Sequence, residues 1–442
     1  MSDSVWVTKT IRELGAGNGP TVQTGPFGSQ LHAEDYVEEG VPFILIRNIG
    51  EGGLKPDDLP RISFSDAKRL ARYSLKLGDI VFTRVGRAGS CLLVTENESG
   101  WIISGQTLRL RLDNSKLDNR FLFYALQSHA VQKFVLNSSV GTTRESLNTK
   151  ILESIPVLHP RHCEQRRIAE ILSTLDETID QTEALITKYQ QIKAGLMHDL
   201  FTRGVTPDGH LRPTSAQAPH LYKESPLGWI PKEWEVQALG AFATSRPGGF
   251  VNGPFGSDLL TSELTDSGVP VIYVQDIKED EYRRFSNAHV TERKANELLV
   301  CNVRTEDVLV AKVGDPPGIA AIYHGLERAV VTQDVIRIRP ADDIVPQFLA
   351  SLLNSSVGTR AIRRIIIEGT RARVSLTEFK RLLLLKPSRK EQELIADRVS
   401  IAQRAICALS TYVAKTKIAK HGLMSDLLTG RMRVKVAEPA SA

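Results

Sequence analysis

The residues that come nearest to a catalytic motif, by type and order, are Gly314-Asp315-Pro316-Pro317-Gly318. An acidic side chain followed by two prolines could hold an amino group for methyl transfer, but an aromatic residue would then be needed where Gly318 stands. The sequence contains no glycine-rich loop for a methyl donor, no Gly-x4-Gly-Lys-Ser/Thr phosphate loop and no dinucleotide fingerprint. The segment therefore does not predict a methyl-transfer site.

Metal chemistry is not predicted either. The ten histidines include no His-x3-His or similar pair, and no acidic cluster ends in a Lys as in a metal-dependent nuclease. The four cysteines, Cys91, Cys163, Cys301 and Cys407, are scattered, which argues against both a zinc site and a disulfide framework. We expect a chain that binds a partner without a cofactor, without a metal and without a catalytic step.

Polar side chains that differ between two copies of one segment are better candidates for function. TGPFGSQLHAEDYVEEGVPFILIRNI at 24–49 repeats without a gap as NGPFGSDLLTSELTDSGVPVIYVQDI at 252–277, an offset of 228 residues. Matches continue to the GT dipeptides at 141 and 369. The apolar frame is kept, whereas the polar residues change. The changed pairs are Gln30 and Asp258, Arg47 and Gln275, Asn48 and Asp276, Arg84 and Lys312, and Arg87 and Asp315.

Amide, carboxylate, ammonium and guanidinium groups are the side chains that hydrogen-bond to base edges in the major groove of DNA. Two similar domains with different tips would recognise two different short sequences. The Gly-Thr loops add hydroxyls and arginines suited to phosphate or base contact, and Lys and Arg far outnumber Asp and Glu from 359 to 390. Solvated surface positions and plain capped turns are the alternatives. The candidate DNA contacts are Ser29, Gln30, Arg47, Asn48, Arg84, Arg87, Thr143, Arg144, Ser257, Asp258, Gln275, Asp276, Lys312, Thr370, Arg371 and Arg373.

Two long helices must position these residues. In 164–200, steps of four and three from Ile168 give a heptad stripe with polar flanks, which predicts an exposed helix with one apolar seam. The same stripe returns 227 residues later, including the Lys at one a position, and KAGLMHDLFT at 193–202 returns as KHGLMSDLLT. One such stripe could be ordinary core packing, but two in a shared register predict a helix pair. The seam residues are Ile168, Leu172, Leu175, Ile179, Ile186, Ile395, Val399, Ile406, Leu409 and Val413.

The remaining sequence indicates mixed α/β domains. Strand-like runs at 41–49, 78–86 and 108–112 alternate with turn residues, and a helical stretch follows at 122–136. A Gly-, Pro- and Ser-rich connector should be held by Tyr222 and Trp229, and Ser388 with Glu391 predicts a capping box for the second helix. The expected boundaries are 1–157 and 233–384 for the recognition domains, 158–203 and 385–430 for the helices, 204–232 for the connector and 431–442 for a loose tail.

Composition fits a globular protein, with 442 residues, 41% hydrophobic and 24% charged, and a net charge of +5. A mildly basic chain permits nucleic-acid binding without requiring it. No run of eighteen apolar residues suggests a membrane span, and MSDSVWVTKT does not look like an export signal. We therefore expect no membrane association and a cytoplasmic location.

These segments resemble the specificity (S) subunits of type I restriction-modification systems, and the resemblance covers nearly the whole chain. Its most specific parts are GPFGS with GVPFILIRNI and GVPVIYVQDI, GDIVFTRVG, and IPVLHPRHCEQRRIAEIL at the start of the first helix. DLFTRG and YKESPLGWIP are similar to that family as well. The start of the second helix departs from the pattern, because LLLLKPSRKEQELIADRV lacks the Ile-Pro that precedes the first.

The resemblance implies an α+β architecture of two similar α/β target-recognition domains related by a pseudo-twofold axis. Two long antiparallel helices, forming a coiled coil, would hold these domains apart. It implies a subunit that binds a bipartite, asymmetric double-stranded DNA target and recruits two methyltransferase subunits and, in the full complex, two restriction subunits. Catalysis would belong to those partners.

The length of the helices agrees with a bipartite target. The 33 residues from Ile168 to Leu200 span roughly 50 Å at about 1.5 Å per residue, so the helices could set the spacing between two half-sites. Two rival interpretations stay open: a standalone DNA methyltransferase or nuclease, which would need a motif that is missing, and a coiled-coil scaffold that binds proteins.

Overall fold

The computed structural model divides the chain into two compact units. Unit 1 comprises residues 1–183 and 411–442, and unit 2 comprises residues 184–410. The residues that the structure describes are 6–15, 19–26, 30–50, 53–55, 58–84, 90–139, 147–367 and 372–435.

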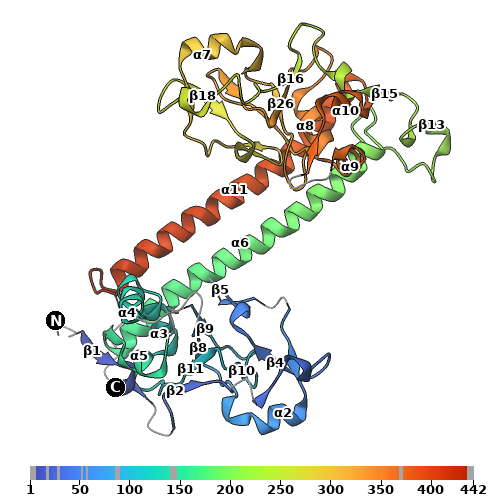
Figure 1. Cartoon of the computed structure of the whole chain (residues 1–442). Coiled ribbons are helices and arrows are strands. Elements are labelled where there is room, and N and C mark those ends of the chain that lie inside the picture. The colour runs from blue at the N-terminus through green and yellow to red at the C-terminus, as the bar shows by residue number, and fades with distance from the viewer. Residues whose placement is uncertain are drawn as a thin grey trace. The chain divides into compact units, whose positions relative to one another are not determined.

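Unit 1 is built around a four-stranded antiparallel sheet of order β2-β11-β8-β9 (Figure 1). Every residue of β8 and β11 is buried: β8 is apolar except for Thr83, whereas β11 alternates, with Leu108 and Leu110 in the core and Arg109 on the opposite face. The apolar faces of the helices complete this core, with Phe121 and Leu122 fully buried. The strands are β2 (Val22–Thr24), β8 (Ile80–Thr83), β9 (Cys91–Leu93) and β11 (Thr107–Leu110), and the helices are α1 (Ile11–Leu14), α3 (Asn119–Leu126), α4 (His129–Ser139) and α5 (Thr149–Ser154).

A second sheet of order β10-β4-β7-β3 packs on its own apolar cluster, which includes Phe43, Ile62 and Tyr73. A short β5-β6 hairpin follows β4, and β1 pairs antiparallel with β12. These elements are β1 (Val7–Thr10), β3 (Tyr36–Val37), β4 (Val41–Ile44), β5 (Ile49–Gly50), β6 (Gly53–Leu54), β7 (Arg61–Ile62), β10 (Ile102–Ile103), β12 (Pro156–His159) and α2 (Phe64–Arg69).

Unit 2 repeats this topology. Its main sheet has the order β16-β26-β23-β24, its second sheet β17-β21-β18-β25-β22, and β15 pairs with β29 as β1 does with β12. The strands are β15 (Glu235–Ala238), β16 (Phe250–Asn252), β17 (Leu264–Thr265), β18 (Val269–Ile272), β19 (Ile277–Lys278), β20 (Glu281–Tyr282), β21 (His289–Val290), β22 (Asn302–Val303), β23 (Val308–Ala311), β24 (Ala320–Ile322), β25 (Ala329–Val331), β26 (Val335–Ile338), β27 (Ile366–Ile367), β28 (Arg373–Val374) and β29 (Leu383–Lys386). The helices are α7 (Glu292–Glu297), α8 (Pro346–Asn354), α9 (Ser356–Arg363) and α10 (Leu376–Arg381). The predicted tandem duplication of a mixed α/β domain is therefore confirmed, whereas the helix expected at 122–136 is divided into α3 and α4.

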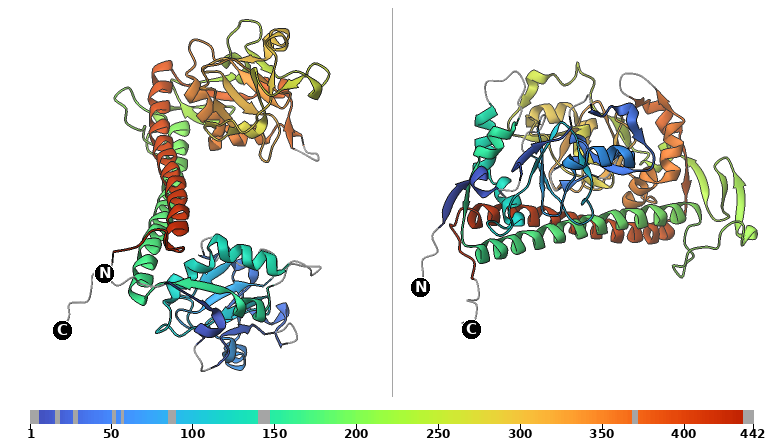
Figure 2. Two further views of the ribbon diagram at one scale, coloured as in Figure 1. Left: turned by 90° about the vertical axis from the view of Figure 1, so that its left-hand side faces the viewer. Right: turned by 90° about the horizontal axis from the view of Figure 1, so that it is seen from below.

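Each unit also contains half of each long helix, α6 (His162–Thr202) and α11 (Arg389–Leu427). In unit 1 the start of α6 shares a core with the end of α11 through Leu172 and Leu427. In unit 2 the end of α6 shares a core with the start of α11 through Leu200 and Val399. The helices therefore run antiparallel within each unit, as the ribbon views also show (Figures 1 and 2).

The two helices begin at equivalent positions because their Glu-Gln pairs are used in the same way. Gln165 accepts from the amide of Asp118 (2.9 Å) and donates to the carbonyl of Pro160 (2.8 Å). Gln392 accepts from the amide of Val345 (2.9 Å) and donates to the carbonyl of Pro387 (3.0 Å). The missing Ile-Pro before α11 therefore does not shift its start.

The connector between the copies lies on unit 2 and includes the hairpin of β13 (Tyr222–Ser225) and β14 (Gly228–Pro231). Tyr222 is buried and its hydroxyl donates to the carbonyl of Pro213 (2.6 Å), as expected, but the expectation for Trp229 is wrong, because its side chain is exposed. The predicted tail falls largely on residues 436–442, which lie outside the described residues.

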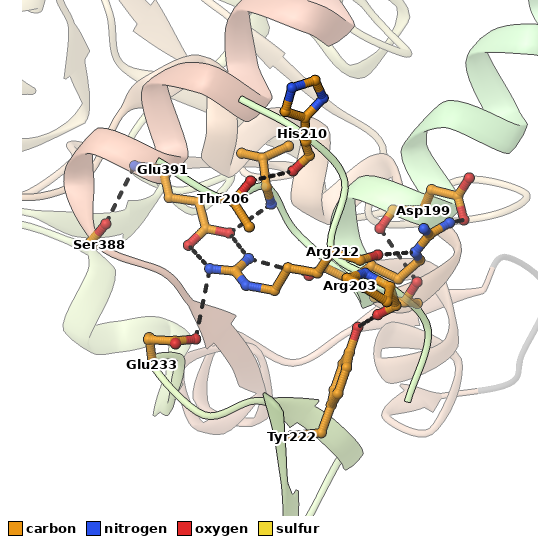
Figure 3. Close-up of polar contacts among 12 residues, drawn as sticks. Asp199, Arg203, Thr206, His210, Arg212, Tyr222, Glu233, Ser388 and Glu391 are labelled. Atoms are coloured by element: carbon orange, nitrogen blue, oxygen red, sulfur yellow. Dashed lines mark hydrogen bonds and ion pairs between the residues drawn. The ribbon is translucent and has the colours of Figure 1, made fainter. Parts of the chain in front are cut away.

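A buried ion pair fastens this connector to the start of α11 (Figure 3). Arg212 contacts Glu391 at 2.5 and 3.1 Å, and Glu391 also accepts from the amide of Val205 (2.9 Å). Ser388 caps α11 by accepting from the amide of Glu391 (3.4 Å). Only this half of the predicted capping box is seen among the hydrogen bonds of these residues, because the Glu391 carboxylate is occupied by the connector.

Candidate DNA interface

In unit 2, the segment that follows β23 of the main sheet lies beside β28 of the β27-β28 hairpin. The amide of Val374 donates to the carbonyl of Lys312 (3.1 Å), and the amide of Gly314 donates to the carbonyl of Ala372 (3.2 Å). The base of the β27-β28 hairpin is thereby fixed to the segment that follows β23, and Val313 forms a bridge with Arg373. Lys312 and Arg373, which are far apart in the sequence, are brought to one edge of the unit.

Unit 1 has the same arrangement, since the amide of Leu147 donates to the carbonyl of Arg84 (2.7 Å). Arg84 is half-buried at the end of β8, while Arg373 in unit 2 is exposed. The candidates nearest these junctions in sequence, together with one in the Gly-Pro-Phe-Gly-Ser segment, lie outside the described residues. They are Ser29, Arg87, Thr143, Arg144, Thr370 and Arg371.

Two neighbouring candidates in the turn after β4 differ in their exposure to solvent. Arg47 is exposed and forms an ion pair with Asp58 (2.9 Å). Asn48 is fully buried, accepts from the amide of Leu45 (3.1 Å) and donates to the carbonyl of Lys55 (3.3 Å). The side chain of Asn48 therefore shapes the turn that carries Arg47.

The equivalent turn of unit 2 shows the same difference in exposure, with Gln275 exposed and Asp276 fully buried. The Asp276 carboxylate accepts from the amides of Tyr273 (2.9 Å) and Phe285 (2.8 Å) and from the amide and hydroxyl of Ser286 (3.0 and 2.7 Å). A buried carboxylate that already accepts four hydrogen bonds is not available to contact a DNA base. We therefore correct the candidate set by assigning Asn48 and Asp276 to the fold.

The Gly-Pro-Phe-Gly-Ser segments need their first glycine for packing. A Cβ atom on Gly25 would lie 2.2 Å from the carbonyl oxygen of Ser104, and one on Gly253 would lie 2.2 Å from the carbonyl group of Thr332. The backbone therefore passes directly against the main sheet before it reaches the polar candidates.

Beyond this glycine the two units differ. In unit 1 the Tyr73 hydroxyl donates to Gln30 (3.3 Å), and the Tyr73 ring is buried. In unit 2 the residue equivalent to Tyr73 is Cys301, which lines a cavity of about 490 Å³ together with the exposed Ser257 and Asp258. Burial raises the pKa of the Cys301 thiol, so the thiol stays protonated there.

Four arginines, two within and two directly after the equivalent strands β11 and β26, were not among the predicted site residues. Arg111 donates two hydrogen bonds to the Asp79 carboxylate (2.5 and 2.7 Å), and Arg339 donates two to the Asp307 carboxylate (2.8 and 2.9 Å). The Arg-x-Arg pattern that repeats in both copies was the available signal, because alternate residues of a strand share one face. These ion pairs stabilise the main sheet that carries the candidate contacts.

The other arginine of each strand is buried against a turn of the second sheet. Arg109 donates to the carbonyls of Arg72 and Ser74 (both 3.1 Å), and Arg337 donates to the carbonyl of Val300 (2.8 Å). Burial lowers the pKa of Arg337 to about 10, against the raising effect of Asp307. A charged group held at this depth links the two sheets of each unit.

A basic surface is found on α9, where Arg360, Arg363 and Arg364 are exposed near the start of the β27-β28 hairpin. The corresponding residues of unit 1, Gln132, Val135 and Leu136, carry no charge. The two units thus present different charge beside equivalent candidate loops.

Within each unit, the predicted seam residues face the partner helix or the domain core. Seven of these ten side chains are nine-tenths or more buried, and the other three are partly buried. The buried seam residues are Ile168, Leu172, Ile179, Ile395, Val399, Ile406 and Val413, and the partly buried ones are Leu175, Ile186 and Leu409.

Among the described residues there is no group of three His, Cys, Asp or Glu residues that could hold a metal ion. All four cysteines are free thiols. None of the described helices is both long enough and apolar enough to cross a membrane.

Comparisons with known proteins agree with this geometry. Residues 5–193 match the family model of the type I restriction modification DNA specificity domain. The type I restriction enzyme MjaVIII specificity subunit of Methanocaldococcus jannaschii is 25% identical over 339 residues, which cover 76% of this chain and 75% of that protein. The putative type I restriction enzyme MjaX specificity subunit of the same organism is 24% identical over 415 residues, covering 90% and 88%.

Solved structures show the same fold. The crystal structure of the type I restriction-modification S subunit from M. genitalium superimposes with a TM-score of 0.58 at 17% identity and covers 97% of each chain. Residues 5–193 therefore match the type I restriction modification DNA specificity domain, and most of the chain is similar in sequence to specificity subunits of type I restriction enzymes.

Proposed function

We propose that each unit reads one half of a bipartite, asymmetric double-stranded DNA target. The observation that carries this proposal is that both units keep one frame while polar side chains at equivalent, exposed or partly exposed positions differ. Arg47 stands against Gln275, and Gln30 stands against Asp258. Different donors and acceptors on identical frames select different bases.

The proposed contacts fall into two groups. Base contacts come from Gln30, Arg47, Ser257, Asp258 and Gln275, with Ser29 as a further candidate from the sequence. Contacts to bases or phosphates come from the paired segments, through Arg84, Arg87, Thr143, Arg144, Lys312, Thr370, Arg371 and Arg373, and the α9 arginines add phosphate contacts.

The proposed domain boundaries follow the sequence: recognition domains at 1–157 and 233–384, helices at 158–203 and 385–430, and a connector at 204–232. Each recognition domain packs on half of each helix. The helix pair then serves as the ruler that sets the gap between the half-sites.

As a type I specificity subunit, the chain works in a complex with DNA, methyltransferase and restriction partners. We propose that two copies of each partner are recruited and that they perform all catalysis. Exposed apolar side chains on the described helices, such as Leu185, Ile192 and Ile401, support docking of methyltransferase on the outer faces of the pair. The cytoplasm, where the DNA is, is the proposed location.

The test is to express the chain together with its genomic neighbours and to map methylated adenines in the host DNA by single-molecule sequencing. The expected result is one motif with two specified halves and a fixed gap. A continuous motif, or no motif although the partner methyltransferase is active, would contradict the proposal and favour a protein-binding scaffold.

A further inference from the structure

Lys193 is buried in the seam of unit 2, at a heptad position where an apolar residue is the rule. Its ammonium group contacts the Asp280 carboxylate at 2.6 Å, the Gln403 side-chain oxygen at 2.8 Å and Glu279 at 3.5 Å. Gln403 belongs to α11, whereas Asp280 and Glu279 belong to the turn between β19 and β20. One lysine thus joins both helices to the recognition domain.

Asp280 is held rigidly within the recognition domain. Its side chain is fully buried, and its second carboxylate oxygen accepts from Asn354 of α8 (2.6 Å). Asn354 also bonds twice to the backbone of Ala320 (both 2.8 Å), and the amide of Asp280 donates to the Ala320 carbonyl (3.1 Å). A shift of Lys193 relative to Asp280 would therefore have to move β24 and α8 as well.

In unit 1 the equivalent lysine also pairs with a carboxylate, but this carboxylate lies on a helix. Lys420, which corresponds to Lys193, pairs with Asp176 of α6 (2.5 Å) and lies over the ring of Tyr124 (5.4 Å). The Tyr124 hydroxyl donates to the same Asp176 (2.8 Å). The charge on Lys420 is therefore balanced by the helix pair, and among the described residues of the recognition domain Tyr124 contributes a neutral phenol.

The sequence repeats make this exchange explicit. Gln403 occupies the position equivalent to Asp176, and Gly52 occupies the position equivalent to Asp280. In unit 2 the carboxylate therefore comes from the recognition domain, and the helix carries an amide at the equivalent position.

We propose that the Lys193–Asp280 pair is a positioning contact that fixes the orientation of the second recognition domain on the helices. The inference rests on the proposed function, because orientation matters where a domain must meet its half-site at a fixed gap. The apolar contacts around Leu200 anchor the domain at one end, and the ion pair prevents it from turning about that anchor. Base selection stays with the contacts described above.

The test compares two variants by the methylated motifs they produce. Asp280→Asn removes the partner charge and leaves a buried ammonium, so it can also destabilise the unit. Asp280→Asn with Gln403→Asp returns a carboxylate to the helix position that Asp176 occupies in unit 1. The double variant should therefore recover the wild-type melting temperature while the domain is no longer tied to the helices.

The double variant is expected to methylate the same two half-sites, but with additional gaps one base pair longer or shorter, and with several-fold less methylation at the native gap. Lys417→Met, which removes an exposed ion pair with Glu183 (2.7 Å), is the control and should leave the gap unchanged. A stable double variant that keeps the single native gap would overturn the inference. Failure of the proposed function is distinct, because the wild-type chain would then yield no bipartite motif.

Discussion

At the scale of single residues, arginine performs two separate tasks in each unit. Arg109 and Arg337 are buried and bond to backbone carbonyls, so their loss would disturb the fold. Arg47 and Arg373 are exposed at the proposed interface, so their loss should alter binding and spare the fold. Exposure, rather than residue type, separates the two groups.

Arg47→Ala should change the first half-site and leave the second intact. The ion pair with Asp58 is exposed, so we expect less than about 1 kcal/mol of lost stability. A lost base contact should cost about 1 to 3 kcal/mol of discrimination. Binding selection on randomised DNA measures this, with Gln275→Ala as the matched variant for the second half-site. Changes at both halves in either variant would contradict independent reading.

Glu391→Gln should destabilise unit 2, because it leaves the buried Arg212 with only the exposed Glu233, 3.7 Å away, as a countercharge. We expect a loss of about 3 to 5 kcal/mol in the free energy of unfolding, measured by urea titration. Glu183→Gln is the control, since Glu183 pairs with Lys417 (2.7 Å) and their side chains are 49% and 52% exposed, so it should cost about 1 kcal/mol or less. Equal losses would mean that burial does not decide the effect.

Asp180 on α6 gives a pH-dependent prediction. Burial, followed by repulsion from Asp176 and Glu183, raises the pKa of Asp180 above its ordinary 3.8. An acid with a raised folded pKa favours folding while both states are protonated, and this contribution is lost as the pH rises through the unfolded and then the folded pKa.

Asp180→Asn should therefore raise the melting temperature at pH 7, and the gain should shrink as the pH falls toward 4. Thermal unfolding across that range measures it. A gain that is equal at all pH values would point to packing instead of titration.

At the scale of elements, equivalent helices of the two units differ in charge. α9 and its C-cap residue, Arg364, carry three exposed arginines, whereas the corresponding positions in unit 1 are uncharged. Phosphate contacts release counterions and make binding weaker at high salt. Unit 2 should therefore contribute more of the salt-dependent affinity than unit 1.

Replacing Arg360, Arg363 and Arg364 by Ala should flatten the slope of log Kd against log salt by up to about 2.7, at about 0.9 per phosphate contact. The selected DNA sequence should stay the same. Lys223→Ala with Lys232→Ala, which removes two exposed positive charges from the connector, is the control. An unchanged slope in the arginine variant would remove α9 from the proposed interface.

At the scale of the whole molecule, the proposed ruler is the helix pair. A heptad inserted after Glu183 in α6 and another before Thr411 in α11 keeps the seam in register and lengthens each helix by about 10 Å. The gap in the methylated motif should then grow by up to about three base pairs, with both half-sites unchanged. An unchanged gap would contradict the ruler.

The repeat made much of this molecule predictable. Two copies with one apolar pattern predicted two similar α/β domains, and the shared heptads from Ile168 predicted the long helices. Side-chain partners across long sequence distances were not predictable. Asn48 and Asp276 looked like exposed readers until the turns that enclose them were seen, and Trp229 lacked the core that Tyr222 has. The partner of Lys193 comes from a turn that no periodicity marks.

The division of the chain into its two units has a consequence for protein synthesis. Unit 2 is continuous, but the core of unit 1 needs Met424, Leu427 and Leu428 from the far end of α11. The first domain to leave the ribosome is thus the last to complete its apolar core. A chain that stops early, at residue 410, leaves Leu172 uncovered in unit 1. Chaperones and proteases would recognise the exposed apolar surface of such a fragment before the fragment binds a methyltransferase.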